Sequence, residues 1–140
     1  MFLPDVNFWL ALAIDSHVHH STAQSWFDGR SSDECFFCRM TQQGFLRLVT
    51  NPKDVDSAAV TLLEAWQVYD AMLGDSRVCF VREPAGLEPI WRGYTQHQSF
   101  SPKVWNDAFL AAFARAADRE LITFDKGFSR YTDVNINILS

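Results

Sequence analysis

The sequence lacks a long hydrophobic run and a full set of pairable cysteines. Its longest apolar stretch, from Phe8 to Ile14, is far shorter than the ~20 residues that a membrane-spanning helix needs. Three cysteines cannot all pair in disulfides, and no signal peptide precedes the first apolar segment, which starts at Met1. We therefore expect a soluble, cytoplasmic protein in a reducing compartment, without membrane contact.

The sequence also lacks a surplus of positive charge, because its formal net charge is -5. This balance excludes proteins that coat nucleic acid through bulk electrostatics, since those carry a basic surplus. A nuclease stays compatible with it. Clustered carboxylates that hold a divalent cation contribute negative charge, and the bound ion reverses the local sign where a phosphate lies.

Repeats, linkers and low-complexity tracts are absent, so we expect one domain over residues 1–140. A hydrophobic content of 48% is enough for an ordinary core. The 12 Phe and 5 Trp are more than one small core can bury. Some of these aromatic side chains should therefore lie on the surface or at a contact with a partner.

Short apolar segments alternate with helical patterns along the chain. Thr41, Asp56 and the Ser101-Pro102 pair are the expected helix starts, and Pro4 should lie at the end of its strand. The resulting fold is a three-layer α/β/α sandwich with a central, mostly parallel sheet. Strands are expected at 1–4, 35–37, 78–81, 121–124 and, as an edge, 134–138; helices are expected at 7–14, 17–27, 41–49, 56–73, 87–94 and 101–116.

Three acids that are distant in sequence are candidates for one site. Asp5 ends the first expected strand, Asp125 follows the fourth, and Asp107 lies early in the last helix. Open parallel sheets bind ligands beyond the carboxyl ends of their strands. Carboxylate oxygens suit hard cations such as Mg²⁺ or Mn²⁺. The sequence therefore predicts a divalent metal site at this edge of the sheet.

Several motifs resemble those of PIN-domain nucleases, in the same order and over nearly the whole chain. They are Asp5-Val-Asn7, Asn106-Asp107-Ala108 followed by Leu110-Ala-Ala112, and Thr123-Phe-Asp125-Lys-Gly-Phe128. Two further stretches are similar to one group of VapC-type toxins, which are the toxin halves of bacterial toxin–antitoxin pairs. These are Ser16 to His20 and Thr41 to Pro52.

The resemblance implies an endoribonuclease that hydrolyses RNA phosphodiester bonds with Mg²⁺ or Mn²⁺, favouring unpaired RNA. Its catalytic, metal-binding acids would be Asp5, Asp107 and Asp125, supported by Asn7, Thr123 and Gln43. A cognate antitoxin would insert a helix or tail into a hydrophobic groove and an arginine into the acidic site. The toxin itself is expected to be a homodimer.

The chain departs from the family pattern at one acid. PIN domains usually carry a glutamate early in the helix after the second strand, and the corresponding residue here is Gly44 or Gln43. A catalytically weak or inactive PIN-fold binding module is therefore an alternative. Gly44→Glu should be tolerated, because glutamate is the better helix former, unless the position is packed too closely for a side chain. It should also raise the metal affinity.

Other motifs leave alternatives open. Lys103 and Lys126 are the preferred RNA-binding cations, with Arg39 beside them, out of a wider set that also includes Arg47, Lys53 and Arg130. His17, His19 and His20 are expected to be structural or exposed, and Cys35 and Cys38 to pack on opposite faces of the sheet. Strand-end aspartates are also found in phospho-acceptor regulatory domains, which are a more distant alternative.

Overall fold

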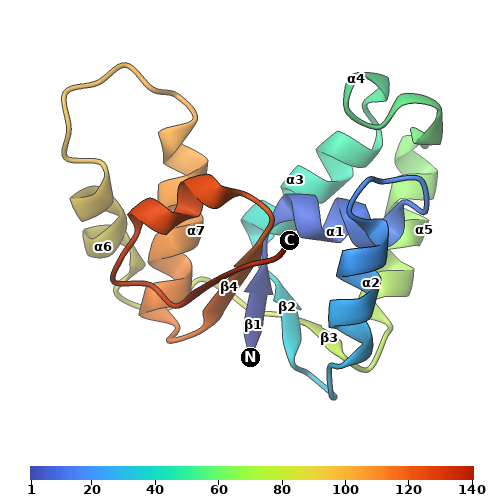
Figure 1. Cartoon of the computed structure of the whole chain (residues 1–140), viewed down its shortest axis with the longest axis horizontal. Coiled ribbons are helices and arrows are strands. Elements are labelled where there is room, and N and C mark those ends of the chain that lie inside the picture. Colours follow the sequence, from blue (N-terminus) through green and yellow to red (C-terminus); the bar gives the residue numbers. More distant parts are fainter.

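Five parallel strands form the centre of the computed structural model, which describes residues 1–140 (Figure 1). The strands are β1 Phe2–Pro4, β2 Cys35–Phe37, β3 Val78–Phe80, β4 Glu120–Thr123 and β5 Ile136–Ile138. They lie in the order β3-β2-β1-β4-β5, and every pair is parallel. The predicted parallel sheet with a C-terminal edge strand is confirmed, and Pro4 is the last residue of its strand.

Seven helices connect and cover the strands. They are α1 Val6–Ala13, α2 His20–Asp28, α3 Arg39–Val49, α4 Pro52–Val55, α5 Leu62–Leu73, α6 Leu87–Tyr94 and α7 Val104–Ala116. Two short 3₁₀ helices, η1 Asp56–Ala58 and η2 Lys126–Arg130, complete the chain. No helix has the length and apolar character needed to cross a membrane.

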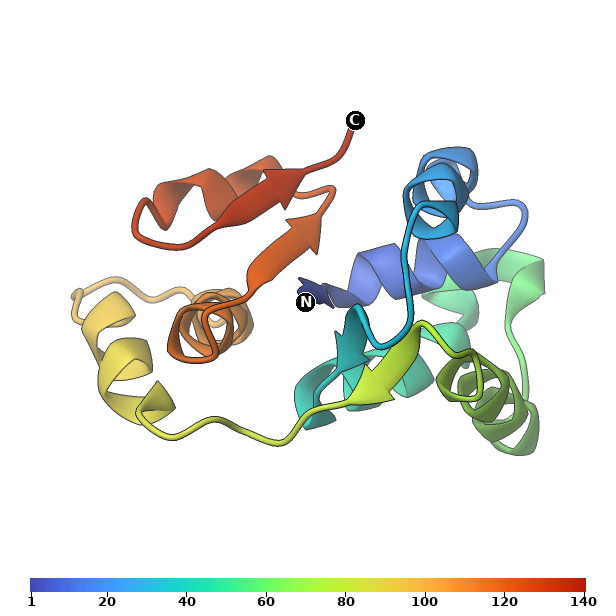
Figure 2. The same cartoon turned by 90° about the horizontal axis from the view of Figure 1, so that it is seen from below.

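Two hydrophobic cores, one on each face of the sheet, give the three predicted layers. One core combines α1, α2, α3 and α5 with Cys35 and Phe37. The other combines α6 and α7 with Phe36 and Cys38. Figures 1 and 2 show α6 and α7 on one side of the sheet and α1, α2 and α5 on the other. Residues along β2 alternate between the cores, so Cys35 and Cys38 do pack on opposite faces and remain free thiols.

Two predicted helix starts, at Thr41 and Asp56, are wrong, each for a local reason. Cys38 is the N-cap of α3, and Thr41 is the third helical residue, whose hydroxyl accepts a hydrogen bond from the Cys38 N–H at 3.0 Å. Asp56 does not cap α5: its φ is positive, at 51°, whereas an N-cap residue is typically extended, and it begins the short η1 helix instead. The α5 helix begins instead with a reciprocal cap between Thr61 and Glu64.

Two further helix starts, those of α7 and α2, shift toward the C-terminus. Residues 102 and 103 form a turn in which the Ser101 carbonyl accepts the Val104 N–H at 3.1 Å, so α7 begins at Val104. Residues 15–19 form turns before α2, which begins at His20 rather than at His17.

Gly44 allows α3 to approach α1 closely. It is buried, and a Cβ atom at this position would lie 2.6 Å from Cγ2 and 3.3 Å from Cγ1 of Val6. Position 44 is therefore packed too closely for a side chain, which is the exception to the expected tolerance of Gly44→Glu. Since Val6 directly follows Asp5, this contact also fixes the start of α1.

Gly44→Ala should lower the free energy of unfolding by about 1 kcal/mol. Overpacking typically costs ~1–3 kcal/mol, which exceeds the gain of ~1 kcal/mol in helix propensity. Val6→Ala in the same chain removes the obstruction, so the double variant should be more stable than the sum of the two single effects predicts. Urea unfolding of the four proteins measures this. A Gly44→Ala variant more stable than the parent would show that the helices separate at no cost.

Candidate active site

The three candidate acids line one cavity of about 160 Å³. Asp5 directly follows β1, Asp125 lies two residues after the end of β4, and Asp107 lies in the first turns of α7. Because Asp5 and Asp125 follow the carboxyl ends of β1 and β4, the cavity lies at this edge of the sheet, as expected for an open parallel sheet. Two amides, Asn7 and Asn106, also line it. The sequence assigned no role to Asn106, although it is part of the same motif as Asp107.

Asp5 is held in place by both of its carboxylate oxygens. Oδ1 accepts the Phe8 N–H at 2.8 Å and so caps α1. Oδ2 accepts a short hydrogen bond from the Thr123 hydroxyl. That hydroxyl in turn accepts the Asp125 N–H at 2.9 Å. Thr123, which is fully buried, therefore fixes the relative positions of two acids from different strands.

Asp107 and Asp125 are more accessible than Asp5. Asp107 is partly exposed, and its Oδ2 lies 3.1 Å from Nη2 of Arg130. Asp125 is exposed, and its Oδ1 accepts the Gly127 N–H at 2.8 Å, which caps η2. Both carboxylates thus keep oxygens that can face a ligand in the cavity.

The acids carry negative charge that the protein only partly neutralises. Burial raises the pKa of Asp5 to about 6, against the hydrogen bonds from Thr123 and Phe8, and the charges of Asp125 and Asp107 raise it further. Burial and the nearby Asp125 also raise the pKa of Asp107, while Arg130 lowers it. Such a site favours a bound cation, because a cation relieves both burial and repulsion.

The donor set fits a hard divalent cation in kind, since it consists of carboxylate and amide oxygens. No three Asp, Glu, His or Cys side chains converge closely enough to enclose an ion in this structure. A cation would therefore keep water or phosphate oxygens among its ligands, which is usual for Mg²⁺. The residues fit an open site rather than a closed cage.

The position of the missing family acid is filled by packing rather than by another ligand. Gly44 faces Val6, and Gln43 is exposed and does not line the cavity, so its supporting role remains a prediction. Thr41 bonds to Cys38, and Glu34 accepts the Ser31 N–H on a different loop. The α3 helix contributes Met40, Arg47 and Leu48 to the cavity instead.

The cations at the cavity are not those that the sequence favoured. Arg47 lines it and Arg130 pairs with Asp107, whereas the exposed Lys103 and Lys126 do not line it. Arg39 lies over the Phe80 ring, 4.9 Å from its centre. Arg47 follows Gly44 by three residues, and residues three apart lie on the same side of a helix. This spacing is the sequence signal that could have placed Arg47 beside Gly44. RNA contacts by Lys103, Lys126 and Arg39 remain predictions.

The histidines have structural contacts. Nδ1 of His20 lies 2.8 Å from the Ala11 carbonyl oxygen, and its Nε2 lies 3.6 Å from Asp15. The His19 ring stacks on Phe124, with 4.3 Å between ring centres. These contacts join the turns before α2 to α1 and to the end of β4, as a structural role predicts.

Comparisons with known proteins find relatives along the whole chain. The model of the PIN domain matches residues 2–134. Ribonuclease VapC41 of Mycobacterium tuberculosis is 43% identical over 145 residues, covering 100% of this chain and 99% of that protein. Ribonuclease VapC38 of the same species is 34% identical, covering 91% of this chain and 86% of that protein.

Solved structures of low sequence identity share the fold. VapC20 of Mycobacterium tuberculosis, a toxin that cleaves the sarcin-ricin loop, has a TM-score of 0.68 at 19% identity and covers 93% of this chain and 94% of that one. VapBC2 of Rickettsia felis, bound to a DNA fragment from its promoter, has a TM-score of 0.68 at 11% identity, with coverages of 99% and 98%.

Asp5→Asn should raise the melting temperature by a few degrees at pH 7.5 without divalent cations. Folding raises the pKa of Asp5 from 3.8 to about 6. The protonated form therefore contributes stability that is complete below the unfolded pKa and is lost as pH rises through about 6. Asparagine keeps the helix cap without the buried charge.

Thermal unfolding of parent and variant, with and without Mn²⁺, measures this effect. Mn²⁺ should stabilise the parent but not Asp5→Asn, and the two proteins should converge in stability toward pH 4. Equal stabilisation of both proteins by Mn²⁺ would place the cation away from Asp5.

Proposed function

Since the chain belongs to the PIN-domain family, we propose that it is a toxin endoribonuclease that hydrolyses RNA phosphodiester bonds with Mg²⁺ or Mn²⁺. One observation carries the proposal: Asp5, Asp107 and Asp125 line a single cavity at the carboxyl ends of the strands. Relatives that are 43% and 34% identical bear the name ribonuclease. A cytoplasmic location and a homodimer remain predictions.

Asp5, Asp107 and Asp125 would hold the cation, which when bound would polarise a phosphoryl oxygen and activate a water. The protein itself positions the substrate and its charges. Thr123 keeps Asp5 oriented by donating to its Oδ2. The guanidinium groups of Arg47 and Arg130 can bind phosphate oxygens in pairs of hydrogen bonds. Asn7 and Asn106 supply neutral N–H donors at the same cavity.

A catalytically weak binding module is the second candidate, and Gly44 is the observation that favours it. The packing of Gly44 on Val6 leaves no space for the fourth acid of the family. Fewer carboxylates give less compensation for the dehydration of a small divalent ion. Cleavage of RNA in Mn²⁺ or Mg²⁺, compared with cleavage in EDTA, decides between the two. The phospho-acceptor alternative has no support from the family match.

An apolar groove is the surface that we propose for the cognate antitoxin. The groove has a volume of about 330 Å³ and lies between α1, α2 and α5, with Asp75 as its one charged residue. Trp9 contributes to it, and its buried indole Nε1–H has no hydrogen-bond acceptor. A partner that fills the groove would bury apolar side chains against this lining. This arrangement fits an amphipathic antitoxin helix.

Thr123→Val should reduce RNA cleavage or the apparent affinity for Mn²⁺ by about 10- to 100-fold, as loss of a hydrogen bond to a metal-binding carboxylate typically does. Valine has nearly the shape of threonine, so the buried site stays filled. Thr132→Val, which removes an exposed hydroxyl, is the matched control. Cleavage of a single-stranded RNA at a series of Mn²⁺ concentrations gives both quantities. Full activity of a folded Thr123→Val protein would contradict the positioning role.

Ala71→Glu should weaken antitoxin binding by at least about 10-fold, since one desolvated charge at an interface commonly costs more than ~1.4 kcal/mol. Ala71 is exposed and lines the groove, away from the acidic cavity. RNA cleavage should therefore be unchanged. Leu62→Glu is the control, because Leu62 lies on the opposite side of α5. Calorimetry with the product of the neighbouring small gene measures the affinity. Equal weakening of binding by Leu62→Glu would show that the antitoxin does not bind specifically at this groove.

A further inference from the structure

The segment that joins α6 to α7 combines aromatic side chains with a local absence of acids. No Asp or Glu occurs from Pro89 to Asn106, although the chain as a whole has a net charge of -5. The same segment carries Arg92, His97 and Lys103. It also contains four aromatic residues: Trp91, Tyr94, Phe100 and Trp105. Cations interleaved with aromatic rings are typical of surfaces that bind single-stranded nucleic acid.

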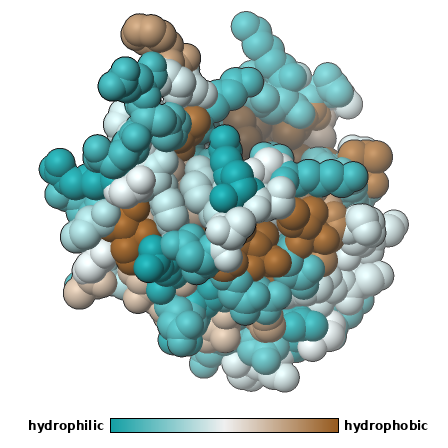
Figure 3. Space-filling view, turned by 60° about the vertical axis from the view of Figure 1, so that its left-hand side comes forward, coloured by the Kyte–Doolittle hydropathy of each residue, from teal (hydrophilic) through white to brown (hydrophobic).

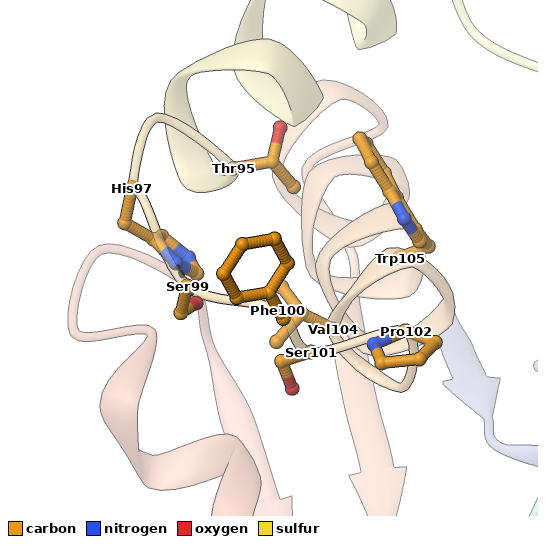
Figure 4. Close-up of a pocket in the computed structure, with 8 residues that line it drawn as sticks. All are labelled: Thr95, His97, Ser99, Phe100, Ser101, Pro102, Val104 and Trp105. Atoms are coloured by element: carbon orange, nitrogen blue, oxygen red, sulfur yellow. Dashed lines mark hydrogen bonds between the residues drawn. The ribbon is translucent and has the colours of Figure 1, made fainter.

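Two adjoining hollows lie in this segment, with Thr95 and Trp105 common to both. One has a volume of about 310 Å³ and includes His97, Ser99 and Phe100. The other has a volume of about 340 Å³ and lies along α6. In Figure 4 the Phe100 ring stands in the opening, between Thr95 at the end of α6 and Trp105 on α7. We call Phe100, Trp105 and these hollows the α6–α7 aromatic surface.

Both rings of this surface are exposed, and Trp105 is also held in place by a contact with Trp91. Phe100 is fully exposed and Trp105 is 56% exposed. The Trp91 indole donates a hydrogen bond to the Trp105 carbonyl at 3.1 Å, and the two rings meet edge to face, 6.0 Å apart. Figure 3 shows apolar patches among hydrophilic side chains on this side of the molecule. A pre-arranged ring loses little entropy when a flat ligand stacks on it.

The aromatic surface adjoins the acidic cavity along α7. Val104 and Trp105 line the first hollow, and the next two residues, Asn106 and Asp107, line the acidic cavity. A helix is only ~10 Å across, so the two sites lie on neighbouring sides of one helical turn. The loop between α6 and α7 is at the end of the molecule where the strands end (Figure 1).

We propose that the α6–α7 aromatic surface binds an unpaired RNA base that neighbours the nucleotide cleaved at the acidic cavity. This inference rests on the proposed ribonuclease function and adds a substrate subsite to it. Base rings stack on exposed aromatic side chains. Hydroxyl and imidazole groups of Thr95, His97 and Ser99 can bond to the polar edge of the base.

Charge favours RNA as the occupant over a second copy of this acidic chain. Lys103 is free of ion pairs, and the one acid at the second hollow, Glu88, is paired with Arg92 at 2.9 Å. The Arg92–Glu88 pair is neutral, so the hollows present neutral polar groups beside their rings, and the charge of Lys103 lies in the adjoining turn. This combination matches a nucleotide, which has a flat base, polar base edges and an anionic phosphate.

The test measures the affinity for fluorescein-labelled single-stranded RNA by anisotropy, in an Asp5→Asn background that prevents cleavage. Phe100→Ala and Trp105→Ala should each weaken binding about 10-fold, the loss typical of one stacked base. Trp105→Phe, which keeps a ring, should retain most of the affinity. Trp66→Ala is the matched control, because Trp66 is a similarly exposed tryptophan on α5, and it should change nothing.

RNAs with one abasic nucleotide, moved stepwise along the strand, locate the bound base. An abasic nucleotide at one position should weaken binding to the parent by about the same factor as Trp105→Ala, and should cause no further loss in that variant. If the RNA binds and the active protein cleaves it, but the alanine variants bind as well as the parent, the aromatic surface has no such role while the ribonuclease function stands.

Two other outcomes also overturn the inference. Loss of a dimer in Phe100→Ala or Trp105→Ala, seen by sedimentation velocity with RNA affinity per protomer unchanged, would make the surface a contact between copies. Absence of any RNA binding and cleavage by the parent would remove the proposed ribonuclease function itself, and the subsite with it.

Discussion

The hydrogen bond between Thr123 and Asp5 is the interaction on which the arrangement of the candidate site depends. It joins the end of β1 to the end of β4 through two buried side chains. The remaining oxygen of Asp5 caps α1, and the Thr123 hydroxyl also accepts the backbone N–H of Asp125. The Asp5 carboxylate therefore links the ends of β1 and β4, the start of α1 and, through Thr123, the backbone of Asp125.

This arrangement buries a negative charge, which lowers the free energy of unfolding when no cation is bound. Burial raises the pKa of Asp5, and the neighbouring acids raise it further. Arg130 compensates one of those neighbours, Asp107, by direct contact. Because a cation and Arg130 would share the Asp107 carboxylate, the guanidinium is the group best placed to turn toward a phosphate when a cation binds. Stability and ligand affinity are thus opposed at this site, as is common where function needs concentrated charge.

The sequence was sufficient to predict the elements with strong patterns. The buried strands, the amphipathic helices and the convergence of Asp5, Asp107 and Asp125 follow from hydrophobic periodicity and from the geometry of parallel sheets. Helix starts were less predictable, because Thr41, Asp56 and Ser101 are all plausible caps and only the folded backbone selects among competing ones. Likewise, no local pattern shows that Gly44 faces Val6, or that Arg47 and Arg130 rather than the nearby lysines approach the acids. Those contacts join segments that are distant in sequence.

The contact between Gly44 and Val6 also limits which sequences are reachable by successive single changes. Any side chain at position 44 meets the branched methyl groups of Val6, which is rigid within its helix. A smaller residue at position 6 would leave a void beside the Asp5 carboxylate until position 44 also changes. Each order of the two steps passes through a less stable protein. The glycine and the valine are therefore mutually entrenched, and a fourth acid can enter this helix only when both positions change together.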